Sequence, residues 1–345
     1  MKRKRVGVIG YGNLGRTFVG LLDRKRETLR AEGLDLVLTC VLGRGGGVHD
    51  AGGLDPAELI EAAARSPRLA DAPGFDPSFT LRRMLDDGLA DIAVEFTPTN
   101  KETGEPGLTH IRECLKAGLH VATGNKGPVL VAWEELSALA RQRGLLLGIS
   151  CTTGGALPTI LNGRDAMAGS TILSMEGVLN GTCNFILDRM ERDGLAYDEA
   201  LQAAQAAGIA EANPAMDVEG WDTAVKLLIL VRAVMGVSLR LDGIPVRGVA
   251  GVTAEDVRRA QEAGTRIKLV GRAWREGDAV RAEVAPMVLG PENPLYGISG
   301  KNKAVRYVSD TMGELFVSGG ASDPTAAAAA SLRDIVNACR SGLIQ

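Results

Sequence analysis

The sequence contains few of the residues that most often bind metals or form disulfides. Only three histidines occur in 345 residues, and none of them belongs to a cluster of cysteines or carboxylates. The cysteines are odd in number and widely spaced, without a CxxC pair: Cys40, Cys114, Cys151, Cys183 and Cys339. This pattern argues against a zinc site. It predicts reduced, mostly buried thiols, as in a cytoplasmic protein.

Long apolar runs and an excess of one charge are also missing. There is no stretch of about 18 or more uncharged apolar residues, which argues against a membrane span. The basic opening "MKRKR" leads directly into a predicted strand without an apolar h-region or a cleavage site, so no signal peptide is expected. A net charge of -3 and a pI of about 5.8 give no preference for nucleic acid or for an anionic membrane.

What is present indicates a globular protein with two domains. The chain is 45% hydrophobic and 23% charged, and it is long enough for a sizeable core. Residues 5–42 read as strand, glycine turn, helix and strand, and short apolar strands recur at 91–98, 119–125 and 145–151 with helices between them. This alternation predicts parallel βαβ units in a Rossmann-type, doubly wound sheet. The Gly/Pro-rich residues 45–80 are expected to be a mobile excursion around one helix.

The pattern changes after residue 150. Strands are predicted at 171–181 and within 267–289, with helices at 185–208 and 222–236, which indicates a second α+β domain. A last helix is predicted with Asp323 as its N-cap and Pro324 at its first position, and it is expected to pack against the first domain. The predicted domains are residues 1–150 with 320–345, for dinucleotide binding, and residues 151–319, for catalysis and dimerisation.

The first turn carries a dinucleotide-binding pattern. Gly10, Gly12 and Gly15 have GxGxxG spacing between a predicted strand and a predicted helix. In this context the glycines give a tight turn, close backbone approach to a pyrophosphate, and close helix packing. The intervening Tyr11, Asn13 and Leu14 belong to the same predicted cofactor site.

The end of the second strand favours NADP over NAD. The acidic residue that binds the ribose of NAD is missing there, because Asp35 opens that strand instead of ending it. Arg44 follows the strand and lies where a 2′-phosphate would bind. The alternative that Arg44 is an ordinary solvated loop residue stays open.

A nicotinamide enzyme also needs a group that moves the substrate's proton. The three histidines occupy positions typical of structural residues, so the stronger candidates are Lys126 and Lys226. Asp222 and Lys226 are four residues apart and therefore share one face of a helix. A lysine held by a carboxylate in a partly dry cleft can donate a proton, although an ordinary surface ion pair has the same spacing.

Residues 204–226, "AQAAGIAEANPAMDVEGWDTAVK", resemble the signature segment of homoserine dehydrogenases. The positions that match are Ala204, Gly208, Asn213, Pro214, Asp217, Gly220, Asp222 and Lys226. Other family-like pieces follow the same order along nearly the whole chain: "GYGNLG", "FTPTN", "TGEPG", "TGNKGP", "TGGALPTI", "VLNGTCNFIL" and "GGASDPTAAAAASLRDIV". The chain is similar to the short form of the family, with neither an aspartate kinase nor a regulatory domain.

The resemblance implies NAD(P)-dependent interconversion of L-homoserine and L-aspartate 4-semialdehyde, on the route to threonine and methionine. It implies that Lys226 is the proton donor, paired with Asp222, and that Lys126 is a second catalytic lysine near the nicotinamide. The implied substrate-binding residues are Glu211, Asp217, Asp222 and Thr182. The implied nicotinamide-side residues are Thr97, Pro98, Thr99 and Asn100, with Gly320 and Ala321 closing over the cofactor. A cytoplasmic homodimer is expected.

One position departs from the family pattern. Ser150 stands where the family commonly has a glutamate that helps to hold a monovalent cation such as Na⁺. The backbone carbonyls that would complete this site are those of Thr153, Gly155 and Leu157. With serine present, the glycines there can equally form a simple turn.

Two other functions remain as alternatives. An amino-acid oxidoreductase of similar architecture, such as an aspartate dehydrogenase, would not be expected to carry the signature of residues 211–226. A catalytically inactive NADP-binding regulator would be expected to have lost Lys226 or Asp222, and both are present.

Overall fold

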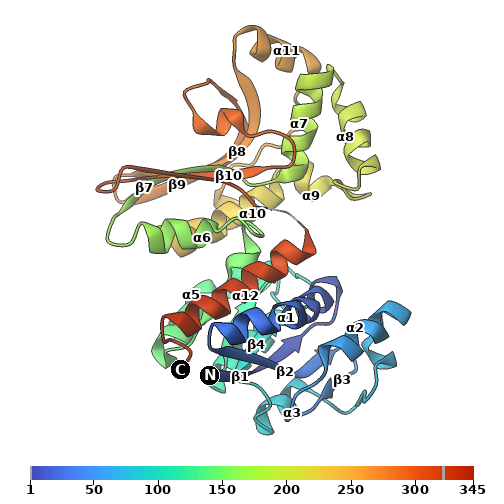
Figure 1. Ribbon diagram of the computed structural model, residues 1–345. Coiled ribbons are helices and arrows are strands. Elements are labelled where there is room, and N and C mark those ends of the chain that lie inside the picture. The colour runs from blue at the N-terminus through green and yellow to red at the C-terminus, as the bar shows by residue number, and fades with distance from the viewer. Residues whose placement is uncertain (1, 321–322) are drawn as a thin grey trace. The chain divides into compact units, whose positions relative to one another are not determined.

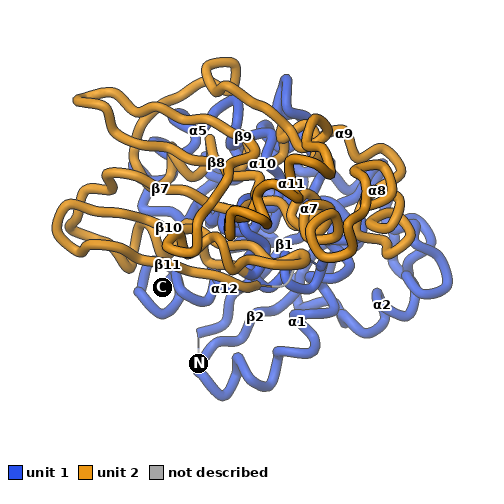
Figure 2. Tube along the Cα trace, turned by 90° about the horizontal axis from the view of Figure 1, so that it is seen from above, with its two compact units in different colours: residues 1–156, 323–345 blue, residues 157–322 orange. Residues whose placement is uncertain are grey.

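The computed structural model describes residues 2–320 and 323–345 (Figure 1). The chain forms two compact units, coloured separately in Figure 2. Unit 1 comprises Met1–Ala156 and Asp323–Gln345, and unit 2 comprises Leu157–Ser322. Each unit is built on a sheet of its own.

Unit 1 contains a six-stranded sheet of order β3-β2-β1-β4-β5-β6. Its strands are β1 (Lys2–Ile9), β2 (Leu34–Gly43), β3 (Gly46–His49), β4 (Ile92–Glu95), β5 (His120–Thr123) and β6 (Leu147–Gly148). All neighbouring strands are parallel except β2 and β3, which are antiparallel. The predicted doubly wound sheet is therefore confirmed, with one antiparallel edge strand added.

Helices cover both faces of this sheet, which explains why its strands are apolar on both sides. One face carries α1 (Asn13–Ala31), α2 (Pro56–Arg65) and α12 (Pro324–Arg340). The other carries α3 (Leu81–Asp86), α4 (Gly107–Lys116) and α5 (Lys126–Arg143). Phe18 and Ile335 lie in the first of the two cores, whereas Ile111 and Leu136 lie in the second.

The Gly/Pro-rich residues 45–80 contain the edge strand, which was not predicted. β2 turns into β3 through Arg44 and Gly45, and Gly45 has a φ of +78°. Gly47 and Asp76 then exchange backbone hydrogen bonds of 3.0 and 2.7 Å. Residues 45–80 are thus tied to the sheet by the pairing of β2 with β3 and by these two hydrogen bonds. The sequence alone predicts a mobile excursion here.

The last helix begins as predicted. The Asp323 carboxylate accepts hydrogen bonds from the backbone N–H groups of Thr325 and Ala326, at 2.8 and 3.0 Å, and Pro324 occupies the first turn. Because proline lacks an N–H and aspartate satisfies two others, this helix start is well capped. α12 then packs beside α1 within unit 1 (Figure 1).

Unit 2 contains a five-stranded antiparallel sheet of order β11-β10-β7-β8-β9. Its strands are β7 (Ile172–Val178), β8 (Arg266–Glu276), β9 (Ala279–Leu289), β10 (Lys303–Ser309) and β11 (Glu314–Gly319). Its helices are α6 (Thr159–Leu161), α7 (Gly181–Asp193), α8 (Tyr197–Ala206), α9 (Ala215–Val218), α10 (Trp221–Leu230) and α11 (Ala254–Glu262). β10 and β11 were not predicted. The predicted helix 185–208 is two helices, separated at Gly194 with a φ of +67°.

Across both described ranges, no helix has the length and apolar character needed to cross a membrane.

Candidate functional site

The glycine loop after β1 has the geometry that its spacing predicts. Gly10 has a φ of +101°, and a Cβ there would lie 2.6 Å from the carbonyl carbon of Phe96. A Cβ on Gly15 would lie 2.0 Å from the Gly10 oxygen, so α1 packs closely on the turn. Gly12 is different: a Cβ there would meet no atom within 4 Å, and Gly12 is the N-cap of α1. The open space beside it and the unpaired N–H groups of a helix start suit a phosphate.

This loop borders a cavity of about 1120 Å³ at the carboxyl ends of β1, β2 and β4. β2 and β4 flank β1 on opposite sides, which is the topological switch point where dinucleotides bind in such sheets. The predicted cofactor residues that line it are Gly10, Tyr11, Gly12, Arg44, Thr97, Pro98, Thr99 and Asn100. The other predicted residues of the loop, Asn13, Leu14 and Gly15, form the first turn of α1.

The β2 side of the cavity is basic. Arg44 is exposed at the tip of the β2–β3 turn, and Arg68, which was not predicted, also lines the cavity. Asp35 lies near the start of β2, where its carboxylate is 2.8 Å from Nε of Arg30. The acid is therefore at the opposite end of the strand, as the sequence indicated.

On the β4 side, a buried carboxylate organises residues 97–100. Glu95, only 1% exposed, accepts hydrogen bonds from the Thr97 N–H at 2.9 Å and from the Thr123 hydroxyl at 3.1 Å. Asn125 donates to the Thr97 carbonyl at 3.1 Å. His110 Nδ1 lies 3.6 Å from Glu95 Oε1, and His110 lines the cavity. The sequence alone does not identify Glu95 as a site residue, and it indicates a structural role for His110.

Lys126 is the first residue of α5, directly after the Asn125 N-cap. A cation in the first turn opposes the helix dipole, so helix stability does not account for a lysine there. Lys126 also interacts electrostatically with Cys151. Burial nevertheless raises the pKa of the Cys151 thiol to about 11, so this thiol is protonated at neutral pH.

In unit 2, the charged start of α10 forms a compact group. Gly220, with a φ of +89°, precedes the helix, and Asp222 and Lys226 lie one turn apart on it. Lys226 Nζ is 2.7 Å from Asp222 Oδ2, and their side chains are only 16% and 14% exposed. Lys226 also donates to the Leu179 carbonyl at 3.0 Å. These two bonds use two of its three N–H groups and leave the third for a ligand.

Asn180 joins this pair to a second carboxylate. Its side-chain amide donates to Asp217 at 2.7 Å and to Asp222 at 3.0 Å. Its oxygen accepts the Cys183 N–H at 2.9 Å and so caps α7. One amide therefore holds together two carboxylates that would otherwise repel each other.

The other two predicted substrate residues, Thr182 and Glu211, are not joined by a described bond to Asp217, Asp222 or Lys226. Thr182 is buried on α7, and its hydroxyl donates to the Ile209 carbonyl at 3.3 Å. Glu211 is exposed, and within the described ranges no bond joins its carboxylate to Asp217, Asp222 or Lys226. Asp217, Asp222 and Lys226 are thus brought together.

The residues of the predicted cation site are all described, and the closing segment is described as far as Gly320. The Ser150 N–H donates to Asp334 at 2.9 Å, and the Leu157 carbonyl accepts the Thr159 N–H at 2.8 Å. Gly320 has a φ of +76°, and a Cβ there would lie 2.5 Å from the Leu157 nitrogen. Ala321 lies outside the described residues. Among those described, no group of three or more histidine, cysteine or acidic residues could hold a metal.

Comparison with known proteins decides the family. Residues 158–336 match the family model of homoserine dehydrogenase. A homoserine dehydrogenase of Methanocaldococcus jannaschii is 33% identical over 96% of this chain and 97% of its own length. The NAD(+)-dependent homoserine dehydrogenase of Pseudomonas canavaninivorans is 34% identical over 98% and 96%.

The chain belongs to the homoserine dehydrogenase family. A solved homoserine dehydrogenase from Thiobacillus denitrificans has the same fold, with a TM-score of 0.83 and 29% identity over 100% of this chain and 75% of that one. Homoserine dehydrogenases are NAD(P)-dependent oxidoreductases that act on CH–OH groups. The predicted family and enzyme class are therefore confirmed.

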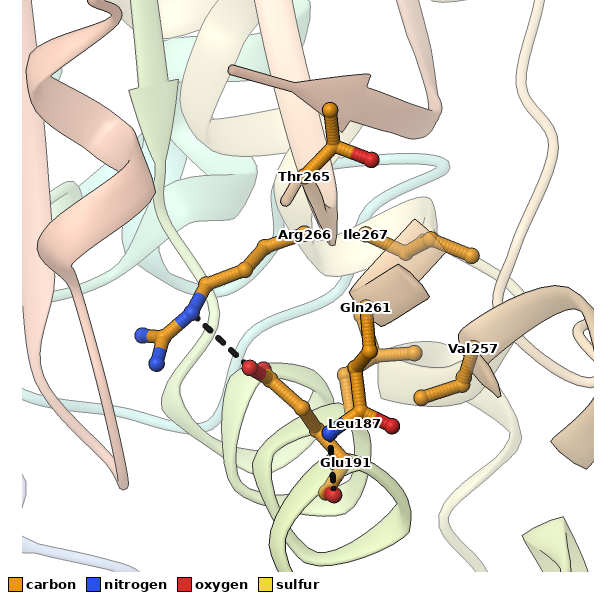
Figure 3. Close-up of a pocket in the computed structure, with 7 residues that line it drawn as sticks. All are labelled: Leu187, Glu191, Val257, Gln261, Thr265, Arg266 and Ile267. Atoms are coloured by element: carbon orange, nitrogen blue, oxygen red, sulfur yellow. Dashed lines mark hydrogen bonds and ion pairs between the residues drawn. The ribbon is translucent and has the colours of Figure 1, made fainter. Parts of the chain in front are cut away.

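A second hollow, in unit 2, is too small to hold a ligand. It lies among α7, α11 and β8, where Figure 3 shows Arg266 directed at Glu191. The Arg266 Nε to Glu191 Oε1 distance is 2.8 Å, and Gln261 donates to the Glu191 carbonyl at 2.8 Å. These contacts close the hollow, which has no interior space even for a water molecule.

Proposed function

We propose that the chain interconverts L-homoserine and L-aspartate 4-semialdehyde with a nicotinamide cofactor, and that Lys226 donates the proton to the aldehyde oxygen. The observation that carries this proposal is the orientation of the Lys226 ammonium. It is fixed 2.7 Å from Asp222 and 3.0 Å from the Leu179 carbonyl, with one N–H still available.

The neighbouring carboxylates suit the rest of the substrate. Homoserine and aspartate semialdehyde both carry an ammonium group, which charge-assisted hydrogen bonds to carboxylates stabilise. Asp217, held by Asn180, is well placed for this role next to Lys226. Glu211 and Thr182 complete the proposed substrate-binding set, and Glu211 would have to turn toward the substrate from its exposed position.

The cofactor, when bound, supplies or accepts the hydride. The cavity of unit 1 fits such a group because Gly12 leaves open space at the start of α1 and the lining is largely preformed. Thr97, Pro98, Thr99 and Asn100 would border the nicotinamide, fixed from behind by Glu95. Lys126, at the carboxyl end of β5, is the proposed second catalytic lysine.

Oxidation of NADPH with L-aspartate 4-semialdehyde tests the reaction. Wild-type protein should turn over, and Lys226→Ala should lower kcat by about 100-fold or more, as expected for loss of a general acid. Glu219→Gln is the matched control, because Glu219 lies in the same stretch and is exposed. NADPH binding without any turnover would refute the proposed reaction. Full activity of Lys226→Ala would refute only the role of Lys226.

We further propose that NADP is preferred over NAD. Support comes from Arg44 and Arg68 beside the cavity and from the absence of an acid at the carboxyl end of β2. One relative is NAD(+)-dependent by name, and another protein of this fold was solved in complex with NADPH, so the family context alone does not decide the matter. Arg44→Ala should raise KM for NADPH about tenfold and leave KM for NADH nearly unchanged. Arg82→Ala, 85% exposed on α3, is the control.

Three further properties are proposed. A monovalent cation such as Na⁺ is proposed at the carbonyls of Thr153, Gly155 and Leu157, and replacing Na⁺ by a large organic cation in the assay tests it. A homodimer is proposed because the unit 2 sheet exposes apolar side chains, with Val288 64% exposed. Light scattering on the purified protein tests the dimer. A cytoplasmic location is proposed from the five free thiols.

A further inference from the structure

A second lysine lies buried beside the Asp222–Lys226 pair. Lys303 is the first residue of β10 and is only 4% exposed. Burying an ammonium group is costly unless nearby groups compensate for it, so its position calls for a reason. The charged groups that act on it include Lys226, which repels its charge, and Asp222, which attracts it.

The sheet of unit 2 explains how these residues meet. β10 runs antiparallel to β7, and Ala304 pairs with Val178 at the end of β7. The next two residues of the chain after Val178 provide the carbonyl and the amide that hold Lys226 and Asp222. The start of β10 and the end of β7 therefore bring Lys303 to the same group of side chains.

The elements around this group contribute the following charged and titratable side chains. α10 contributes Asp222 and Lys226, and α9 contributes Asp217, which Asn180 ties to Asp222. α7 contributes the Cys183 thiol, whose pKa burial raises far above its usual value, so that it carries no charge near neutral pH. The neighbouring strands contribute the uncharged Val178 and Gly319. Lys303 and Lys226 thus lie near the Asp222 carboxylate, and Asn180 ties that carboxylate to Asp217.

We propose that Lys303 acts through Lys226 as a proton-holding residue, which takes up the proton that Lys226 receives when homoserine is oxidised and returns it for the reverse reaction. The inference rests on the proposed function. In the oxidation, the hydride leaves the carbon for the nicotinamide, and the hydroxyl proton passes to the Lys226 amine and then to the Lys303 amine. Charge and protons balance, because one proton leaves the substrate and one is gained by the lysine pair.

The titration of Lys303 fits this role. Burial, with help from the charge of Lys226, lowers its pKa to about 8, whereas Asp222 opposes the shift. A fraction of Lys303 is therefore neutral under mildly alkaline conditions and is able to accept a proton. Fully exposed lysines do not have this property until the pH approaches about 10.

The pH profile of homoserine oxidation is the first test. Between about pH 7 and 10, wild-type kcat should rise with an inflection near the Lys303 pKa, and Lys303→Met should remove the inflection and lower kcat about tenfold. Lys303→Arg, which cannot become neutral, should show the same loss. KM for homoserine should stay within about twofold for both. Lys301→Met, exposed on the preceding loop, is the control. An unchanged profile in Lys303→Met, or a raised KM with unchanged kcat, would overturn the proposal.

The second test does not depend on turnover. NMR of protein labelled with ¹³C-lysine, with the signal assigned by its loss in Lys303→Met, should show Lys303 titrating near pH 8. The midpoint should move upward in Lys226→Met, because a repelling charge is removed, and downward in Asp222→Asn. A midpoint near that of a free lysine, or one insensitive to Lys226→Met, would refute the lysine pair. If wild-type protein oxidises no homoserine at any pH, the proposed function fails, while this titration still decides whether the pair exists.

Discussion

Asn180 links the carboxylates of the proposed substrate site to the start of α7. It uses its whole side chain, with two N–H bonds to Asp217 and Asp222 and one oxygen that caps α7. It therefore couples the stability of a helix to the spacing of two carboxylates of the proposed substrate site. Substitutions that remove only one of these contributions separate the two roles.

We predict that Asn180→Ser lowers kcat/KM for homoserine about tenfold with little change in Tm. Serine is a good N-cap residue, but its hydroxyl cannot bridge the two carboxylates. Asn180→Ala should show the same kinetic loss and in addition destabilise the protein by about 1 kcal/mol. Steady-state kinetics and thermal unfolding of both variants measure this. Equal kcat/KM for Asn180→Ser and wild type would show that the bridge is not needed.

The thiols should be unreactive in the folded protein. Burial raises the pKa values of Cys40 and Cys114 to about 12 and that of Cys151 to about 11, so the reactive thiolate is scarce below those values. We predict that native protein at about pH 8 reacts with a thiol reagent at least 100-fold more slowly than unfolded protein, in which thiols titrate near 8.5. Absorbance after mixing with DTNB, with and without guanidinium, measures this. Rapid labelling of Cys151 in native protein would contradict it.

Single residues differ in how far the sequence reveals them. The Asp222–Lys226 pair could be predicted because both residues lie on one helix, where a spacing of four fixes their contact. Asn180 reaches the same group from the start of α7 and Lys303 from β10, and no local spacing encodes that meeting. Glu95 was hidden for the same reason, because His110 and Thr123, which it contacts along with the adjacent Thr97, reach it from α4 and β5.

Among the elements, the β1–α1 turn shows how three glycines serve different needs. Gly10 and Gly15 have no room for a side chain, whereas a Cβ on Gly12 would point into open space. The sequence pattern predicts all three equally well. Only the structure shows that the fold requires Gly10 and Gly15, whereas Gly12 borders open space that we propose for the phosphates.

We predict that Gly12→Ala folds with an unchanged Tm but binds NADPH about tenfold more weakly, because the added methyl group occupies space meant for the phosphates. Gly15→Ala should lower the Tm by several degrees, because its Cβ would overlap the Gly10 carbonyl. Differential scanning fluorimetry with and without NADPH measures both. A lowered Tm for Gly12→Ala without NADPH would contradict the distinction.

Regular elements were predicted where local patterning is strong. The parallel strands of unit 1 and the capped α12 are examples, because buried apolar runs and the Asp323-Pro324 start are local signals. β3, β10 and β11 were missed. β3 lies in a Gly-rich stretch and exists because it pairs with β2, and β10 and β11 pair with each other across a short turn. Such strands are stabilised mainly by their neighbours, which the sequence of one segment does not show.

At the scale of the whole molecule, unit 1 is built from two distant parts of the chain. Residues up to Ala156 form its sheet, and residues from Asp323 onward, which follow unit 2 in the sequence, add the helix α12. α12 contributes the buried Ala328, Leu332 and Ile335 to the core that also contains Phe18 of α1. The dinucleotide-binding fold therefore depends on the last residues of the chain, far in sequence from the glycine loop.

We predict that a chain ending at residue 322 loses NADPH binding and the cooperative unfolding transition of unit 1. Without α12, the apolar face of α1 and of the sheet is left uncovered. Loss of a single buried Leu or Ile already costs about 2 to 5 kcal/mol, so loss of several exceeds the stability of about 5 to 15 kcal/mol that a domain usually has. A chain lacking only the exposed Gln345 is the control and should match wild type. Calorimetry and NADPH titration measure both chains. Normal NADPH affinity in the chain ending at residue 322 would show that α12 is dispensable for the cofactor site.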